Sequence, residues 1–410
     1  MSYARGLMCP SCGHLCSKNE FKLTCPDCDS PLEVSYDLEG MGRFLKSGWP
    51  QPNGTTSLKQ WEKLLPLTQP ELITRCSLGE TQTPLVRANK TGVDMGLDDL
   101  RFKVEIGPTL SLKDRGSSLC ALKALEIGFE AMCVASSGNN AGSVAAYAAR
   151  AGLPAIVFVQ RDAAPAKFAK MLAYGAQVVR VDGDLSTAGR LCGQMRKHRR
   201  WMESGGPSPY RITAKRLVAY EICAQMGGEV PDAVVFPCGG CAGLIAAYSG
   251  FRELMTMGLI SNMPKLIGVQ LTACDPVTRA FEQGSSEVTP VAKQPTISDA
   301  LTNGNPYWGA RAIAAVRDTG GLFISVSDEE MDTMRKELGT AEGLFLEPAG
   351  AVTAAGLKKA LGKKRIQGLR RVVCTLTGHG LNAPNAANRN QPLPELLPPE
   401  PAAVEKYLGL

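Results

Sequence analysis

One lysine and three glycine-rich turns are the residues of this 410-residue chain whose types and spacing could support chemistry. Lys113 follows a Gly107-Pro108 turn and opens a stretch of small residues that favours a helix. A lysine in such partly buried surroundings can lose its proton and act as the amine of a Schiff base. Lys113 is therefore the candidate catalytic residue.

Each glycine-rich turn directly follows a short apolar run, at residues 136–143, 237–243 and 376–381. Where such a turn opens a helix, its free N–H groups can hold a carboxylate or cradle a phosphate. Asn139 adds a side-chain amide for a ring oxygen. The spacing in 237–243 is not that of the dinucleotide-binding fingerprint. A phosphate cradle, a Schiff-base lysine and a carboxylate-holding turn together indicate pyridoxal phosphate (PLP) and an amino-acid substrate.

Two Cys-x-x-Cys pairs near the N-terminus indicate a metal site. Cys9 and Cys12 form the first pair, and Cys25 and Cys28 form the second. Four thiolates on two tight turns suit tetrahedral zinc, which predicts a zinc-ribbon-like module with a structural ion. Such a closed site has no open position for catalysis. A redox pair is the less favoured alternative, because no strand-to-helix context surrounds either motif.

Composition limits the classes of protein to which the chain can belong. Apolar residues make up 44% and charged residues 20%, and the formal net charge is +6. These values are ordinary for a globular protein and exclude collagen-like and mostly disordered classes. No apolar run is long enough for a membrane span, and the N-terminus lacks a signal-peptide core. We expect a cytoplasmic enzyme with reduced thiols, which binds neither membrane nor nucleic acid.

From about residue 79 onward, short apolar runs alternate with amphipathic stretches such as 140–151 and 166–174. This alternation predicts an α/β architecture with parallel sheets, which bind ligands at the carboxyl ends of their strands. The segment 386–401 is rich in Pro, Asn and Glu, so we expect it to wrap the surface or to be mobile. The expected strands are 131–135, 155–160, 176–181, 233–237, 266–270, 322–326 and 372–376.

The motifs together resemble the threonine synthase family. Gly79-Glu80-Thr81-Gln82-Thr83-Pro84-Leu85 is similar to that family's GExxTPL, and Ser111-Leu112-Lys113-Asp114-Arg115-Gly116 to its SFKDRG. Residues 145–152 and 377–381 are close to its sequences, and the ribbon ending at 31–37 is similar to its opening. The resemblance covers nearly the whole chain. It implies a fold-type II PLP enzyme, with two open parallel-sheet domains and the cofactor in the cleft between them.

On this resemblance we expect four structural parts. The first is a zinc-ribbon-like module over residues 1–38. A larger PLP-binding α/β domain would use residues 39–115 and 219–385, and a smaller domain at 116–218 would close on the substrate. Residues 386–410 would form a C-terminal tail, and the whole chain a homodimer.

The resemblance also implies a role for each matched residue. Lys113 would bind the cofactor covalently and serve as the local base. Thr377 would face the pyridine nitrogen with a neutral hydroxyl, and Arg211 would grip a substrate phosphate. The implied PLP-binding residues are Lys113, Asn139, Gly239, Gly240, Cys241, Ala242, Gly243 and Thr377, and the implied substrate-binding residues are Ser136, Ser137, Asn140 and Arg211.

The chain departs from the family pattern at several positions around the site. It has Leu110 where the family's Asn-Pro-Thr-Gly ends in Gly, and Gly205-Gly206 where the family has Asn-Ser. Residues 213–217 replace the family's Glu-Gly-x-Lys-Thr, and residues 347–351 are more similar to serine/threonine dehydratases.

These departures leave three functional hypotheses. The first is a threonine synthase-like lyase that removes phosphate from O-phosphohomoserine and adds water to give L-threonine. The second is a PLP-dependent serine/threonine dehydratase, or a β- or γ-replacement synthase, that acts on a different amino acid. The third is a zinc-ribbon binding protein on a retired enzyme scaffold, against which the retained Lys113 and Asn139 argue.

Overall fold

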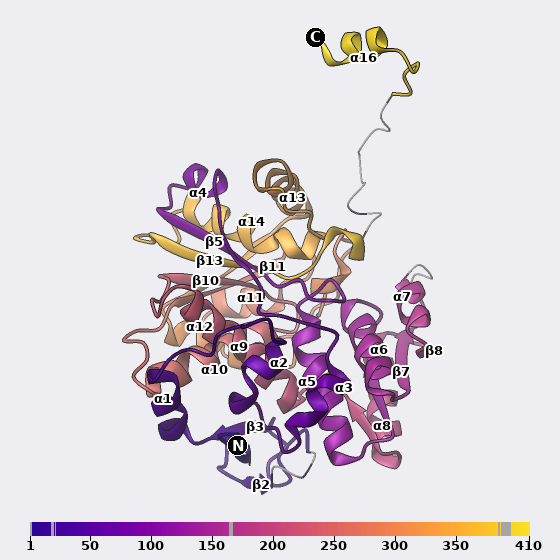
Figure 1. Ribbon diagram of the computed structural model, residues 1–410, viewed down its shortest axis with the longest axis vertical. Helices are drawn as coiled ribbons and strands as arrows, with labels where there is room; N and C mark the ends of the chain where they lie inside the picture. The colour runs from indigo at the N-terminus through magenta and orange to yellow at the C-terminus, as the bar shows by residue number, and fades with distance from the viewer. Residues whose placement is uncertain (1, 18–19, 21, 164–166, 384–385, 387–394) are drawn as a thin grey trace.

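The computed structural model contains three β-sheets, each built from a different part of the chain (Figure 1). It describes all residues except 1, 18–19, 21, 164–166, 384–385 and 387–394. The sheets have six strands in the order β12-β11-β10-β13-β5-β4, four in the order β8-β7-β6-β9, and three in the order β2-β1-β3. The strands are β1 Ala4–Met8, β2 Leu15–Ser17, β3 Glu33–Tyr36, β4 Leu85–Arg87, β5 Asp99–Val104, β6 Ala131–Ala135, β7 Ala155–Gln160, β8 Gln177–Val181, β9 Trp201–Glu203, β10 Ala233–Pro237, β11 Lys265–Leu271, β12 Leu322–Val326 and β13 Arg371–Leu376.

The predicted α/β class with parallel sheets is confirmed. All pairings in the six- and four-stranded sheets are parallel except that of β4 with β5. Each of the seven strands expected from an apolar run is present. The sequence did not predict β5 or β9, which carry charged residues among their apolar ones.

The six-stranded sheet is covered on both faces, which explains why its strands are continuous apolar runs. Helices α13 and α14 lie on one face, and α10 and α12 lie on the other (Figure 1). The four-stranded sheet is covered by α6, α8 and α5. The principal helices are α1 Leu38–Lys46, α5 Lys113–Ile127, α6 Asn139–Ala151, α7 Phe168–Ala173, α8 Leu185–His198, α9 Pro209–Gln225, α10 Ala242–Thr256, α11 Pro276–Glu282, α12 Gly309–Asp318, α13 Asp328–Glu342, α14 Pro348–Gly362 and α16 Pro401–Leu408.

Local signals in the sequence set the ends of the helices that carry the site. Helix α5 ends at Gly128 and α6 at Gly152, both in the left-handed conformation that glycine adopts without steric cost. Helix α13 begins with a capping box between Ser327 and Glu330.

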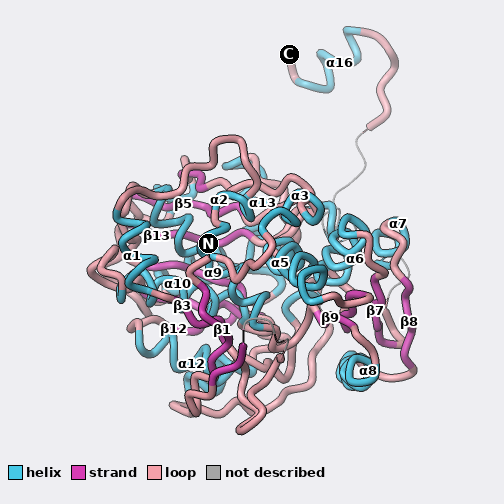
Figure 2. The backbone as a smooth tube through the Cα atoms, turned by 60° about the horizontal axis from the view of Figure 1, so that its bottom comes forward, coloured by secondary structure: helices cyan, strands magenta, loops and turns pink. Residues whose placement is uncertain are grey.

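The three-stranded N-terminal sheet packs against helices of the rest of the protein (Figure 2). The Arg216 guanidinium of α9 lies 3.9 Å from the centre of the Tyr36 ring at the end of β3. Glu33 of the same strand forms an ion pair with Arg311 of α12. The module is therefore attached directly to α9, a helix that also contributes to the site described below.

The expected C-terminal tail contains one helix in its described residues. Residues 401–408 form helix α16, which stands apart from the body and has no buried residue (Figure 1). Half of the segment expected to wrap the surface or to be mobile, residues 387–394, lies outside the described residues. Among the described helices, none combines the length and apolarity that crossing a membrane requires.

Candidate active site

The site forms where the carboxyl ends of neighbouring strands meet the N-terminus of α5. Lys113 is the first residue of α5, and its segment follows β5. Strand β5 pairs with β13, and beyond the strands Ser111 bridges to Gly378 while the Leu112 N–H donates to the Thr377 carbonyl at 3.1 Å. The fold thus places the residue before Lys113 in contact with Thr377.

Hydrogen bonds fix the turn before Lys113. Buried Asp114 accepts from the Thr109 N–H at 2.7 Å and from the Ser143 hydroxyl at 2.6 Å. Leu110 has a φ of +65°, a left-handed conformation that is unfavourable for a residue with a Cβ. Its carbonyl accepts from the His379 N–H at 3.1 Å and from the Asn382 side chain at 2.7 Å. The family's glycine at this position is therefore replaced by a leucine held in a glycine-like conformation.

The turn after β10 is shaped to hold an anion. Cys241 has a φ of +63° and precedes α10, whose first N–H groups receive no side-chain cap. A Cβ on Gly239 would lie 3.2 Å from the Ala300 carbonyl oxygen, so a side chain there would require the neighbouring backbone to shift. Free N–H groups at the start of a 15-residue helix attract phosphate. Gly243 lies against Leu112, so this cradle adjoins Lys113.

The surroundings of Lys113 favour its neutral amine. Burial lowers the pKa of Lys113, and the nearby Arg211 charge lowers it further, while Glu347 opposes both. A neutral lysine can act as a nucleophile and a base, whereas the ammonium form cannot.

Glu347 is a site residue whose role was not predicted from the sequence. It is 5% exposed, and its Oε1 accepts from the Asn139 side chain at 2.8 Å. Burial raises the pKa of Glu347 to about 7, although Asn139 and the charge of Lys113 act in the opposite direction. A carboxyl group with this pKa exchanges protons near neutral pH. In the sequence, the only sign of its role was the dehydratase-like motif at 347–351. That motif does not identify a hydrogen-bond partner for the Glu347 side chain.

The expected substrate side is partly assembled around Asn140. The Arg211 guanidinium donates to the Asn140 side-chain oxygen at 3.2 Å, and the Asn140 amide donates to the Ser204 carbonyl at 3.0 Å. The stem of Arg211 lies on Gly116, one turn beyond Lys113. Ser136 and Ser137 lie on the same turn after β6, and the Ser137 hydroxyl accepts from Gln160 at 3.3 Å.

The residues of the chain itself fit PLP. They combine a buried amine of lowered pKa, an uncapped helix start after a closely packed glycine turn, and a buried threonine at 377. Comparison with known proteins agrees, since the pyridoxal-phosphate dependent enzyme family matches residues 76–378. The chain belongs to this family.

Relatives narrow the assignment within the family. The chain is 34% identical to the threonine synthase of Methanocaldococcus jannaschii over 383 residues, which cover 93% of this chain and 94% of the relative. It is 33% identical to the threonine synthase of Methanosarcina acetivorans, with 92% of each chain covered. The protein is therefore a threonine synthase-like, PLP-dependent lyase.

Solved structures confirm the fold-type II architecture. Threonine deaminase isoform 2 of Solanum lycopersicum superposes with a TM-score of 0.62 at 19% identity, covering 75% of this chain and 85% of its own. Maize serine racemase superposes with a TM-score of 0.61 at 20% identity, covering 73% and 88%.

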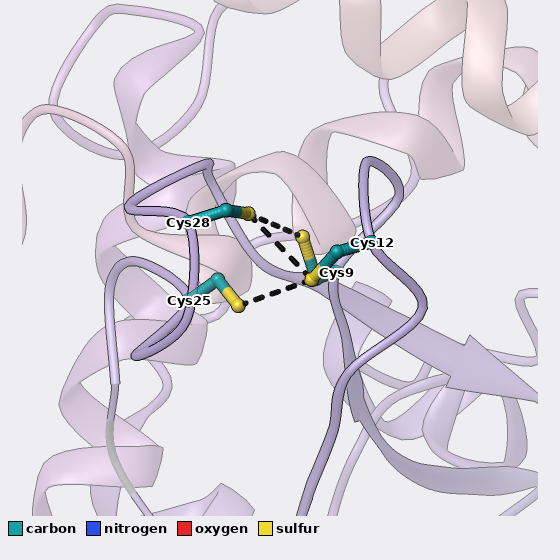
Figure 3. A group of neighbouring side chains, drawn as sticks. All are labelled: Cys9, Cys12, Cys25 and Cys28. Atoms are coloured by element: carbon teal, nitrogen blue, oxygen red, sulfur yellow. Dashed lines mark hydrogen bonds between the residues drawn. The ribbon is translucent and has the colours of Figure 1, made fainter.

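A second candidate site lies far from Lys113 in the sequence. The sulfurs of Cys9, Cys12, Cys25 and Cys28 all lie within 4.8 Å of one another (Figure 3). The Cys9 and Cys28 sulfurs are 3.4 Å apart, and those of Cys12 and Cys25 are 3.6 Å apart. Tetrahedral zinc with bonds of about 2.3 Å requires sulfurs about 3.8 Å apart, so the group is compatible with a zinc-binding module.

Proposed function

We propose that the protein is a threonine synthase, which converts O-phosphohomoserine and water into L-threonine and phosphate. The observation that carries this proposal is the position of Arg211. Its guanidinium lies next to Asn140, and its charge acts directly on the Lys113 amine. A cation so close to the reacting amine suits a substrate that carries an anionic group. The curated relatives with nearly full coverage bear the name of this activity.

When bound, PLP supplies an electron sink that acidifies the substrate's α-carbon. Lys113 would hold the cofactor covalently, the turn from Gly239 to Gly243 its phosphate, and Thr377 its pyridine nitrogen. Asn139 would contact the ring hydroxyl. Its amide also donates to Glu347, so this carboxyl group would influence the charge at that edge of the ring.

The other steps belong to the side chains of this protein. The neutral Lys113 amine would take a proton from the α-carbon and release it before taking one from the β-carbon. Phosphate leaves the γ-carbon, which receives a proton, while water adds its hydroxyl at the β-carbon and a proton returns to the α-carbon. The hydroxyls of Ser136 and Ser137 would orient the substrate carboxylate, while Asn140 and Arg211 would hold its phosphate. Each assignment rests on the charge or the hydrogen-bonding capacity of the side chain itself.

Closure of a smaller domain over the substrate would exclude water until the addition step. We assign residues 116–218 to this domain, and 39–115 with 219–385 to the larger one. The separate six- and four-stranded sheets support this division, since β6 to β9 all lie within 116–218. The bond between Asn139 and Glu347 joins the two parts at the site.

The test is a side-by-side assay of the purified holoenzyme with O-phosphohomoserine, O-phosphoserine, serine and threonine. Threonine and phosphate in equal amounts from O-phosphohomoserine are expected. Lys113→Ala should lose this activity and the visible absorption of the bound cofactor. Lys197→Ala, at an exposed position on α8, should keep both. Ammonia and a keto acid from serine or threonine, with O-phosphohomoserine untouched, would favour a dehydratase instead.

We also propose that Cys9, Cys12, Cys25 and Cys28 bind one structural zinc ion. Their separations support this, whereas Cys16 is not part of the group and His14 instead pairs with Asp27 at 2.7 Å. Elemental analysis should find one zinc per chain, and Cys12→Ser with Cys28→Ser should remove it. Full zinc content in that double variant would contradict the assignment.

We propose a cytoplasmic location and a homodimeric state. All fourteen cysteines are free, which suits a reducing compartment. The homodimer rests on the resemblance to the family. Light scattering of the purified protein should give twice the chain mass, and a monomer would contradict it.

A further inference from the structure

Lys215 is a buried lysine that the proposed reaction does not yet use. It lies on α9 one turn beyond Arg211, and only 3% of it is exposed. Among the residues that the structure describes, its amine forms no hydrogen bond and no ion pair. An isolated buried cation is costly, because it loses its hydration and receives nothing in return.

The other buried lysines of the described chain show how unusual this is. The Lys103 amine donates to Glu221 at 2.7 Å, and the Lys123 amine donates to Glu126 at 2.5 Å. Each is paired with a carboxylate. A lysine retained only to fill space at position 215 would be replaced at lower cost by methionine or leucine.

The neighbours of Lys215 make its charge more costly still. Burial lowers the pKa of Lys215 well below its ordinary value, and the charges of Arg211 and Lys113 lower it further. The remaining titratable neighbour that acts on it is the Cys120 thiol of α5. The carboxylate of Glu203 acts on Arg211, but it is itself paired with Arg196 at 2.9 Å. In the free protein the Lys215 amine therefore favours its neutral form, and a bound anion would let it carry its charge.

A neutral donor lies on the facing helix. Ser117 is on α5, one turn beyond Lys113, and its hydroxyl is buried with no hydrogen-bond partner among the described residues. Its neighbour Gly116 is the residue on which the Arg211 stem rests. An unsatisfied hydroxyl and two cations on facing helices α5 and α9 are the donors that an oxyanion requires.

We propose that Lys215 is a second cation of the substrate's anion subsite. Together with Arg211 it selects amino acids that carry a dianionic group, such as a phosphate monoester, over neutral or singly charged ones. This inference rests on the proposed function and adds to it a residue that determines specificity. It also accounts for a departure in sequence, since Gly205-Gly206 provides no side-chain donors where the family has Asn-Ser. The charge of Lys215 would replace the neutral side-chain donors that are missing at positions 205 and 206.

The first experiment measures binding of inorganic phosphate to the PLP-loaded holoenzyme by calorimetry. In the holoenzyme the cofactor's own phosphate fills the cradle before α10. Lys215→Met should weaken phosphate binding at least tenfold, and Lys215→Arg should restore it to within a few fold. Lys215→Gln is a second variant without charge, should the methionine variant fold poorly. Equal phosphate affinity in the wild type and in either uncharged variant would overturn the proposal, as would a wild type that binds no phosphate at millimolar concentration.

The second experiment distinguishes weaker recognition of the substrate's charge from a general loss of protein structure. For Lys215→Met the KM for O-phosphohomoserine should rise at least tenfold while kcat changes little, and the PLP content should stay at one per chain. A buried residue with a merely structural role would instead lower PLP content or kcat. Lys197→Met, which removes an exposed lysine, is the matched control.

The two experiments also separate the two proposals. A wild type without turnover of O-phosphohomoserine but with phosphate binding that depends on Lys215 contradicts the proposed reaction and supports the subsite. Turnover with a KM that does not depend on Lys215 contradicts the subsite and supports the reaction.

Discussion

Two groups of buried charges lie on the same pair of helices, α5 and α9, and they are organised in opposite ways. In the first, Arg115 bonds both Glu105 and Glu221 at 2.6 to 2.8 Å. In the second, which consists of Lys113, Arg211 and Lys215, the described residues provide no ion pair for any of the three. The first group holds the helices together. The second leaves its basic groups without a partner in the protein, so they can pair with a ligand.

The difference shows how one helix pair can support both stability and binding. Lys103 joins the paired group through Glu221 at 2.7 Å, so two cations and two carboxylates satisfy one another. Pairs of this kind add little net stability but are costly to break. They fix the positions of α5 and α9, and the unpaired basic groups are then held where an anion can reach them.

The largest expected effect comes from breaking the paired group. Arg115→Met leaves Glu105 and Glu221 buried without their partner, and should lower the free energy of unfolding by about 3–5 kcal/mol. Urea denaturation measures this change in the free energy of unfolding. Burial alone would raise the pKa of Glu221, but Arg115 and Lys103 lower it to about 2. The wild type should therefore lose this stability as the pH falls from about 4.5 towards 2, and Arg115→Met should lose much less.

Glu347 should produce the opposite pH dependence. Its pKa in the folded protein, about 7, lies above the ordinary value of 4.5, so the folded state binds more protons between these values. The free energy of unfolding of the cofactor-free protein should fall by up to about 3 kcal/mol as the pH rises from 4.5 to 8. Glu347→Gln should remove this decline. An unchanged pH profile in that variant would contradict the raised pKa.

Replacing Arg211 tests the group that has no ion pairs. Arg211→Met should raise the KM for O-phosphohomoserine about ten- to a hundredfold, since it removes one charge-assisted contact to the phosphate. Because Arg211 has no carboxylate partner to leave behind, the unfolding midpoint in urea should change little. A loss of stability as large as that of Arg115→Met would mean that the two groups do not differ.

The smallest effect concerns the turn that positions Lys113. Leu110→Gly and Leu110→Ala both remove the leucine side chain, but only alanine keeps the cost of a φ of +65°. The glycine variant should be more stable than the alanine variant by about 1 kcal/mol. Equal stabilities would show that the bonds from His379 and Asn382 do not hold the turn in this conformation.

Much of the fold could be predicted from sequence, because parallel strands buried on both faces are continuous apolar runs. Strand β5 was not predicted, because Asp99, Arg101 and Lys103 interrupt its apolar residues. Within the site, motifs identified Lys113 and the turn at 237–243, but the roles proposed for individual residues stay predictions. Glu347 and Lys215 could not be found in this way. What distinguishes each is its neighbours, which come from distant parts of the chain.

The contact between Tyr36 and Arg216 has a consequence for the order in which the newly made chain acquires its structure. Strands β1, β2 and β3 pair only with one another, so this sheet can form once residue 36 has left the ribosome. Its docking surface on α9 begins only at Pro209. The N-terminal sheet can therefore form well before the surface that covers its inner face has been synthesised. A sheet that folds this early keeps that face in water until α9 is available.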